Sequence, residues 1–285
     1  MSGAIMQIER EFKREEIKDE FKVWVQLVKP ELALPANVTG VCEYGFTEVL
    51  NNVIDHSDCQ HVSIKASQSA TETKLEISDD GIGIFARLCA YFHFDSEIHA
   101  LIELVKGKLT VAPSAHSGEG LFFSSKMFDE FSIESGSLSV TFTKNECHVK
   151  SISARKGTRI SMSIENNSLT TAKEVFNLFC DANEMTFYKT RFFLSLAELE
   201  GSLISRSQAK RVAARFDSFS EVELNFTGIE NIGQAFADEL LRVWPLNHPN
   251  TQLQVSNANE SVSKMVSHIQ SRLDLPQPNT NVSPQ

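Results

Sequence analysis

The hydrophobic pattern is clearest at residues 46–60, FTEVLNNVIDHSDCQ, where it predicts a helix. At 3.6 residues per turn the apolar side chains share one arc, and Glu48, Asn52, Asp55 and His56 share the opposite arc. A polar arc of this kind is usually just exposed to solvent. Whether this polar arc also forms part of a functional site depends on the polar residues that other parts of the chain place beside it.

Alternating and helical patterns continue through the first half of the chain. Residues 61–67 and 73–78 alternate apolar and polar positions, which predicts two paired strands joined by a turn at 68–72. This order of elements predicts an α+β sandwich, with a mixed or antiparallel sheet and helices on one face. Further helices are predicted at 96–108 and 121–131, and further strands at 131–135, 138–143 and 158–164.

Changes in pattern divide the chain. The first 30 residues fit strands, or a helix and then a strand, and a capping box at Thr171 and Glu174 opens a new helix. Strands and helices then alternate strictly, which predicts a small α/β domain. The predicted divisions are an N-terminal extension (1–30), a first domain (31–168), a linker helix (169–186), the small α/β domain (187–274) and a disordered tail (275–285).

The composition is typical of a soluble protein of about two domains, because the 285 residues are 41% hydrophobic and 22% charged. The net charge of −10 disfavours nucleic acid, whose binding depends on lysine and arginine releasing counterions. The five cysteines are scattered and odd in number, as reduced thiols usually are. No signal peptide or membrane-length apolar run is visible, so we expect a cytoplasmic protein without membrane association.

Three polar motifs occur in order along the first domain. The helix carries Glu48 and Asn52, the second strand ends in DDGIG (79–83), and GEGL (118–121) precedes the next helix. Alone, a DxGxG sequence is as often a structural turn as a functional one. Together, the three motifs predict one nucleotide site.

The chemistry of the first two motifs suits ATP and Mg²⁺. An ionised Asp79 only accepts hydrogen bonds, so it suits the exocyclic amine of adenine, and Gly81 and Gly83 let the backbone approach the base. Asn52 offers a neutral oxygen to Mg²⁺. Glu48, one helical turn earlier, can activate a water or a hydroxyl.

The GEGL motif predicts the phosphate contact. Gly118 and Gly120 leave amides accessible at a helix start, where these donors and the helix dipole attract anions. Glu119 lies between them, and its carboxylate would repel a triphosphate unless it points outward or faces the metal. Three basic residues between the glycine motifs either contact phosphates from a lid or are simply solvated: Lys106, Lys108 and His116.

Residues 30–165 resemble the ATP-binding domain of the GHKL superfamily, which gyrase-type ATPases, histidine kinases and anti-sigma-factor kinases share. EVLNNVIDH is similar to the N box, DDGIG and GEGL to the two glycine boxes, and KGTRISMSI to the closing strand. The resemblance implies a Bergerat-type sandwich that binds ATP and Mg²⁺, with Glu48 as general base, Asn52 as metal ligand and Asp79 as adenine contact. The further nucleotide contacts that it implies are Gly81, Gly83, Gly118, Gly120, Leu121 and Thr158.

Residues 187–275 resemble the STAS-like domain of unknown function that follows a GHKL domain in a group of uncharacterised proteins. STAS domains proper place a serine or threonine before their second helix, where GHKL kinases phosphorylate it. Here Ile232–Phe236 offers no hydroxyl, and Thr227 lies one turn too early. Four basic residues follow helical spacing, and their shared face either meets an acidic partner or the ATP phosphates or is simply solvated: Arg206, Lys210, Arg211 and Arg215.

We therefore expect a regulatory ATPase whose nucleotide state is coupled to a protein partner through the STAS-like domain. Two alternatives stay open: Glu48 can instead activate a hydroxyl of a partner, as in a serine/threonine kinase, or the pocket serves only folding and docking. No histidine has an HExxxP context, so autophosphorylation is not expected. The sequence leaves homodimer formation open.

Overall fold

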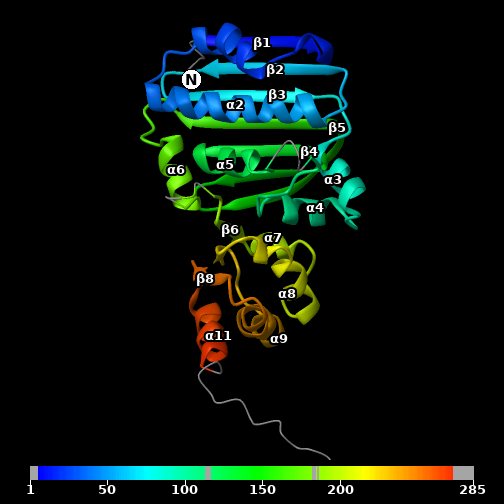
Figure 1. Ribbon diagram of the computed structural model, residues 1–285, viewed down its shortest axis with the longest axis vertical. Helices are drawn as coiled ribbons and strands as arrows, with labels where there is room; N and C mark the ends of the chain where they lie inside the picture. Colours follow the sequence, from blue (N-terminus) through cyan, green and yellow to red (C-terminus); the bar gives the residue numbers. More distant parts are fainter. Residues whose placement is uncertain (1–5, 113–116, 182–183, 185, 272–285) are drawn as a thin grey trace, which may run out of the picture. The chain divides into compact units, whose positions relative to one another are not determined.

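The computed structural model describes residues 6–112, 117–181, 184 and 186–271. The chain forms two compact units, Met1–Thr190 and Arg191–Gln285. Both units combine strands with helices, so the protein is of the α+β class (Figure 1). The predicted tail at 275–285 lies outside the described residues.

The first unit is built on a five-stranded antiparallel sheet in the order β1–β2–β3–β5–β4. In β2 and β3 every second residue is buried, as the alternating sequence predicted. The two strands predicted at 131–135 and 138–143 are one strand, because a register shift at Gly136 (φ 54°) lets the pairing continue. The five strands are β1 (Met6–Lys13), β2 (His61–Gln68), β3 (Glu72–Asp79), β4 (Glu130–Thr143) and β5 (Cys147–Glu165).

The predicted N-terminal extension is part of this sheet. β1 pairs with β2 from Met6, opposite Gln68, to Lys13, opposite His61. Short helical turns follow, and they bury Trp24, whose indole donates a hydrogen bond to the carboxylate of Glu43. In this segment a strand therefore comes first and helical turns follow it, the reverse of the predicted alternative of a helix and then a strand. These turns are η1 (Arg14–Glu16), α1 (Glu20–Val23), η2 (Trp24–Val28) and η3 (Lys29–Glu31).

The helices of the first unit position its polar motifs. The longest, α2, spans 21 residues and buries the predicted apolar arc, including Phe46, Val49 and Leu50. Figure 1 shows α2, α5 and α6 lying over one face of the sheet. The polar arc of α2 is thereby turned toward the segments that follow β3. The helices are α2 (Ala36–His56), α3 (Ile84–Phe92), α4 (Glu97–Leu104), α5 (Gly120–Met127) and α6 (Ala172–Phe179).

The second unit contains a three-stranded sheet in the order β6–β7–β8, in which β7 and β8 are parallel. Its core includes four fully buried phenylalanines: Phe192, Phe216, Phe226 and Phe236. The strands are β6 (Lys189–Phe193), β7 (Glu221–Asn225) and β8 (Gln252–Ser256). The helical elements are α7 (Ser195–Glu198), α8 (Arg206–Ala213), η4 (Phe216–Ser218), α9 (Gln234–Asp238), η5 (Glu239–Val243), α10 (Trp244–Asn247) and α11 (Glu260–Gln270).

Strands and helices alternate in this unit as the sequence predicted. η5 is a π-helical turn that joins α9 to α10, a detail that hydrophobic periodicity does not reveal. In the part of the chain that the structure describes, no helix combines the length and the apolar character needed to span a membrane.

Candidate functional site

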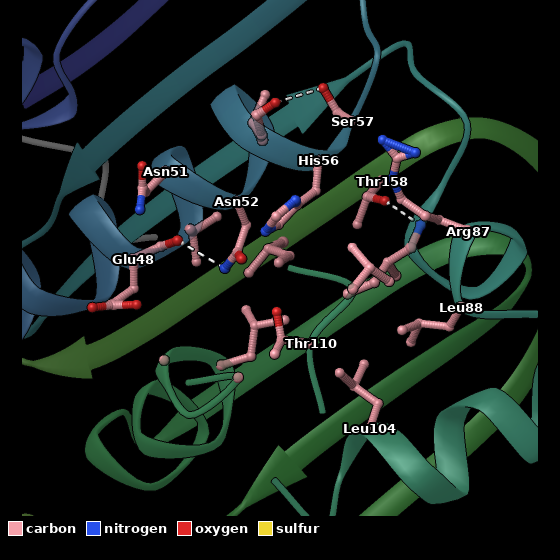
Figure 2. Close-up of a pocket in the computed structure, with 18 of the residues that line it drawn as sticks. Glu48, Asn51, Asn52, His56, Ser57, Arg87, Leu88, Leu104, Thr110 and Thr158 are labelled. Atoms are coloured by element: carbon pink, nitrogen blue, oxygen red, sulfur yellow. Dashed lines mark hydrogen bonds between the residues drawn. The ribbon is translucent and has the colours of Figure 1, made fainter. Parts of the chain in front are cut away.

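A cavity of about 280 Å³ lies in the first unit, and all three predicted motifs contribute to its wall. This volume is near the lower end for small-molecule sites, about 300 Å³. Figure 2 shows Asn52 and His56 extending from α2 into the cavity, with Thr110 and Leu104 across from them. Residues that are distant in sequence therefore meet at one site.

Most of the residues predicted to bind nucleotide lie in this wall. Gly81 is not one of the wall residues, but its amide donates a hydrogen bond to Asp79 Oδ1 at 2.8 Å. His116 is outside the described residues. The predicted residues in the wall are Glu48, Asn52, Asp79, Gly83, Gly118, Gly120, Leu121 and Thr158.

Lys106 lies elsewhere. Its side chain is fully buried, and its ammonium group pairs with the Glu103 carboxylate one helical turn earlier. Its carbonyl oxygen accepts a hydrogen bond from the Thr190 hydroxyl at 2.7 Å. This location differs from both sequence-based expectations, contact with phosphate and exposure to solvent, because a buried carboxylate compensates the lysine inside the unit.

Backbone groups hold the carboxylate of Asp79. Oδ1 accepts from the Gly81 amide, and Oδ2 accepts from the Thr158 amide at 3.3 Å. A Cβ at Gly81 would lie 2.0 Å from the Ser57 carbonyl oxygen, and a Cβ at Gly157 would lie 2.0 Å from the carbonyl oxygen of Asp79. Burial raises the pKa of Asp79, and the two amide hydrogen bonds oppose this shift. Each carboxylate oxygen has two lone pairs, so Asp79 can accept a further hydrogen bond from a ligand amine.

Hydroxyl groups connect β5 to the start of α3 beside the cavity. The Oγ1 of Thr158 accepts a hydrogen bond from the Ile84 amide at 2.9 Å, which is dashed in Figure 2. Thr158 Oγ1 also lies 3.4 Å from Ser135 Oγ. Gly83 has a φ of 92°, and a Cβ there would lie 2.7 Å from Ser135 Oγ. The second glycine of DDGIG is therefore needed where the backbone turns into α3.

Glu48 and Asn52 lie one turn apart on α2. The Nδ2 of Asn52 donates to the Glu48 carbonyl oxygen at 2.8 Å, which orients the amide and leaves its oxygen on the cavity side (Figure 2). The carboxylate of Glu48 lies against the first residue of α5, because a Cβ at Gly120 would be 1.9 Å from Oε2. Asn52 thus presents a neutral oxygen to the cavity, and the Glu48 carboxylate one turn earlier meets the start of α5.

Glu119 directly precedes α5 in the cavity wall, and its side chain does not cap the helix. Burial raises the pKa of Glu119, and the charge of Lys108 and a hydrogen bond with Ser117 oppose the shift. Burial also raises the pKa of Tyr44, and the charges of Glu48 and Glu119 add to that shift. Two carboxylates therefore flank the helix start at which the sequence predicted phosphate.

The sequence assigned no role to several residues of this wall. His56 and Arg87 are polar, and Arg87 pairs with Asp58 at 2.9 Å. The Nε of Arg87 is buried and has no hydrogen-bond partner among the residues that the structure describes. Many of the apolar members come from the segment between the glycine motifs, and their pattern does not differ from that of core residues. They include Leu88, Leu104, Leu109, Val111 and Ile160.

In the second unit, the predicted basic face has acidic neighbours within the same unit. Its ion pairs are Arg206 with Asp238 at 3.9 Å, Lys210 with Glu239 at 3.9 Å and Arg211 with Glu200 at 3.4 Å. Thr227 lies in a turn where its amide donates to Asn225 Oδ1 at 2.8 Å. The basic side chains of these three pairs nevertheless stay largely exposed to solvent.

Comparison with known families identifies a domain in this second unit. Residues 208–263, from within α8 to within α11, match the family model of the STAS-like domain of unknown function. The C-terminal part of the chain is therefore a STAS-like domain. No curated protein matches the chain.

Proposed function

We propose that the first unit is a GHKL-type regulatory ATPase with a Bergerat-type fold, and that its nucleotide state is coupled to a protein partner through the STAS-like domain. One observation carries the proposal: Glu48, Asn52, Asp79 and the start of α5 line the same cavity. Each group is of the chemical type that one part of ATP·Mg²⁺ requires.

The Asp79 end suits an adenine base. Asp79 is 5% exposed and is oriented by the Gly81 and Thr158 amides, so it presents a fixed acceptor to an exocyclic amine. Apolar side chains such as Ile77 and Ile160 line the wall beside it and suit the faces of a planar ring. A guanine would place a carbonyl oxygen against the same acceptor, which disfavours it.

The other end suits phosphates held by Mg²⁺. The Asn52 oxygen is the protein ligand that we assign to the ion. Among the described residues no group of three or more acidic, histidine or cysteine side chains could hold a metal. Phosphate oxygens and waters would complete its coordination, as Mg²⁺ usually keeps several waters. When bound, Mg²⁺ would lower the charge of the phosphates and polarise them.

Glu48 is the residue that we assign to hydrolysis. Its carboxylate lies at the start of α5, where it can accept a proton from a water that attacks the terminal phosphorus atom. The Asn52 amide hydrogen bonds to the Glu48 carbonyl oxygen rather than to its carboxylate, so Asn52 itself does not occupy the proposed proton acceptor. The same geometry would serve a partner's hydroxyl, which gives the kinase alternative.

Binding and turnover test the proposal separately. ATP with Mg²⁺ should raise the melting temperature of the full chain, and Asp79→Asn should remove most of this shift. Glu48→Gln should retain binding and lower phosphate release by about 10²-fold or more. Glu130→Gln, at an exposed position of β4, is the control. The absence of any stabilisation by ATP would sink the proposal, and label on a partner protein instead of free phosphate would favour the kinase.

A further inference from the structure

We propose that Glu119 makes this pocket selective for the metal complex of a nucleotide over the metal-free polyanion. The inference rests on the proposed nucleotide binding and concerns one residue of that site. Helix starts normally attract anions, because their amides are unpaired and the helix dipole is positive there. In this chain that attraction is opposed at the position where a phosphate would bind.

The opposition comes from two carboxylates on either side of one residue. Glu119 precedes Gly120 in the chain, and Oε2 of Glu48 lies against the Cα of Gly120 from α2. Both carboxylates also act on the hydroxyl of Tyr44, one turn before Glu48 on α2. They therefore share a small, partly desolvated volume at the cavity wall.

Few basic side chains lie among the described residues around this volume. Lys108 interacts electrostatically with Glu119, and its ammonium group also lies over the Phe187 ring, 5.4 Å from the centroid. In the described part of the cavity wall Arg87 is the one lysine or arginine, and it pairs with Asp58. The same described part of the wall contains three carboxylates, those of Glu48, Asp79 and Glu119.

These charges act in opposite directions on the two forms of the ligand. A metal-free triphosphate brings several negative charges toward Glu48 and Glu119, and repulsion between partly buried charges lowers its affinity. A divalent cation on the phosphates places a positive charge near both carboxylates, which attract it. Glu119 should therefore weaken binding of the free nucleotide and maintain or strengthen binding of its magnesium complex.

Isothermal titration calorimetry on the full chain tests this at pH 8 and constant ionic strength, with ATP in EDTA and ATP in excess Mg²⁺. Glu119→Gln should bind ATP in EDTA about tenfold more tightly than the wild type, because one repulsive charge is gone. Its affinity for ATP·Mg²⁺ should stay within about threefold or fall. Glu119→Asp, which keeps the charge, should retain the wild-type preference, and Glu130→Gln should change neither affinity.

A phosphate series on the wild type needs no variant. In EDTA the affinity should fall from adenosine to ADP to ATP, and in Mg²⁺ it should rise along the same series. Two results would overturn the inference and leave nucleotide binding intact. One is an equal gain in ATP affinity for Glu119→Gln in EDTA and in Mg²⁺, and the other is a wild type that binds ATP equally well with and without Mg²⁺. If neither adenosine nor ATP binds in any condition, the proposed function itself fails.

Discussion

The two ends of the cavity are built differently. At the Asp79 end, glycines lie against backbone: a Cβ at Gly81 or Gly157 would be 2.0 Å from a carbonyl oxygen. At the α5 end, a Cβ at Gly120 would be 1.9 Å from the side chain of Glu48. A carbonyl cannot move without moving the strand that carries it, whereas a glutamate can change rotamer. Substitutions should therefore cost stability at the Asp79 end and activity at the α5 end.

The GEGL motif itself combines both kinds of glycine. Gly118 has a φ of 71°, and a Cβ there would lie 2.5 Å from backbone atoms of Leu109. Gly120, two residues later, is the first residue of α5 and faces a side chain. The first glycine of the motif is thus required by the local backbone, and the second makes room for Glu48.

The largest effect that we expect is from Gly157→Ala. The new Cβ would overlap the Asp79 carbonyl, and alanine would be held at a φ of 71°, so the free energy of unfolding should fall by about 3 kcal/mol. Urea denaturation measures it. Gly40→Ala is the matched control, because a Cβ there meets nothing within 4 Å, and it should stabilise α2 by about 0.5–1 kcal/mol. A loss below about 1 kcal/mol for Gly157→Ala would contradict the backbone account.

The parts of the site that the sequence could predict are those whose geometry is set within a short motif. Short motifs carry their own geometry: α2 fixes Glu48 and Asn52 one turn apart, and DDGIG places Asp79 at a strand end. The N-terminal strand was harder to predict, because Arg10 interrupts its alternation of apolar and charged residues and the segment also fitted a helix followed by a strand. Its place in the sheet depends on pairing with β2, which is distant in sequence.

The cavity wall between the glycine motifs could not be predicted in the same way. Leu104 and Leu109 follow a core-like pattern, and only the folded chain shows that they face a cavity. Lys106 was expected at the phosphates or in solvent, because a charged side chain rarely indicates burial. The spacing of Glu103 and Lys106 permits an ion pair, but it contains no information on how deeply the pair is buried.

Gly120→Ala should separate activity from stability at the α5 end. The new methyl group would displace the Glu48 carboxylate, so phosphate release should fall about tenfold or more. Alanine favours a helix, so the free energy of unfolding should stay the same or rise by up to about 1 kcal/mol. Parallel turnover and urea measurements check both parts. Full activity in this variant would show that Glu48 does not need its present position.

A smaller effect is expected from Thr158→Val at the Asp79 end. Valine cannot accept the hydrogen bond from the Ile84 amide, so the free energy of unfolding should fall by about 1 kcal/mol. Thr158→Ser keeps the hydroxyl and should lose much less. Urea midpoints of the three proteins provide the comparison, and equal losses in both variants would indicate that the methyl group of Thr158, rather than its hydroxyl, contributes the stability.

The smallest effect concerns two adjacent carboxyl groups at the Asp79 end. Burial raises the pKa of Asp79 above its usual value of 3.8. Asp80 is also partly buried, but hydrogen bonds from His61 and the Gln60 amide outweigh that effect and lower its pKa to about 2. Consecutive residues of one motif are therefore linked to stability with opposite signs.

Asp80 contributes stability that is present above pH 3.8 and is lost as the pH falls toward about 2. The contribution of Asp79 is present below pH 3.8 and is lost as the pH rises through its raised pKa. In urea denaturation from pH 2 to 7, the difference in free energy of unfolding between the wild type and Asp80→Asn should shrink as the pH falls. This change should be less than about 1 kcal/mol, because Asp80 is partly exposed. The wild type should lose stability relative to Asp79→Asn as the pH rises above 3.8. If both differences change with pH in the same direction, the two carboxyl groups do not differ as their hydrogen bonds and burial require.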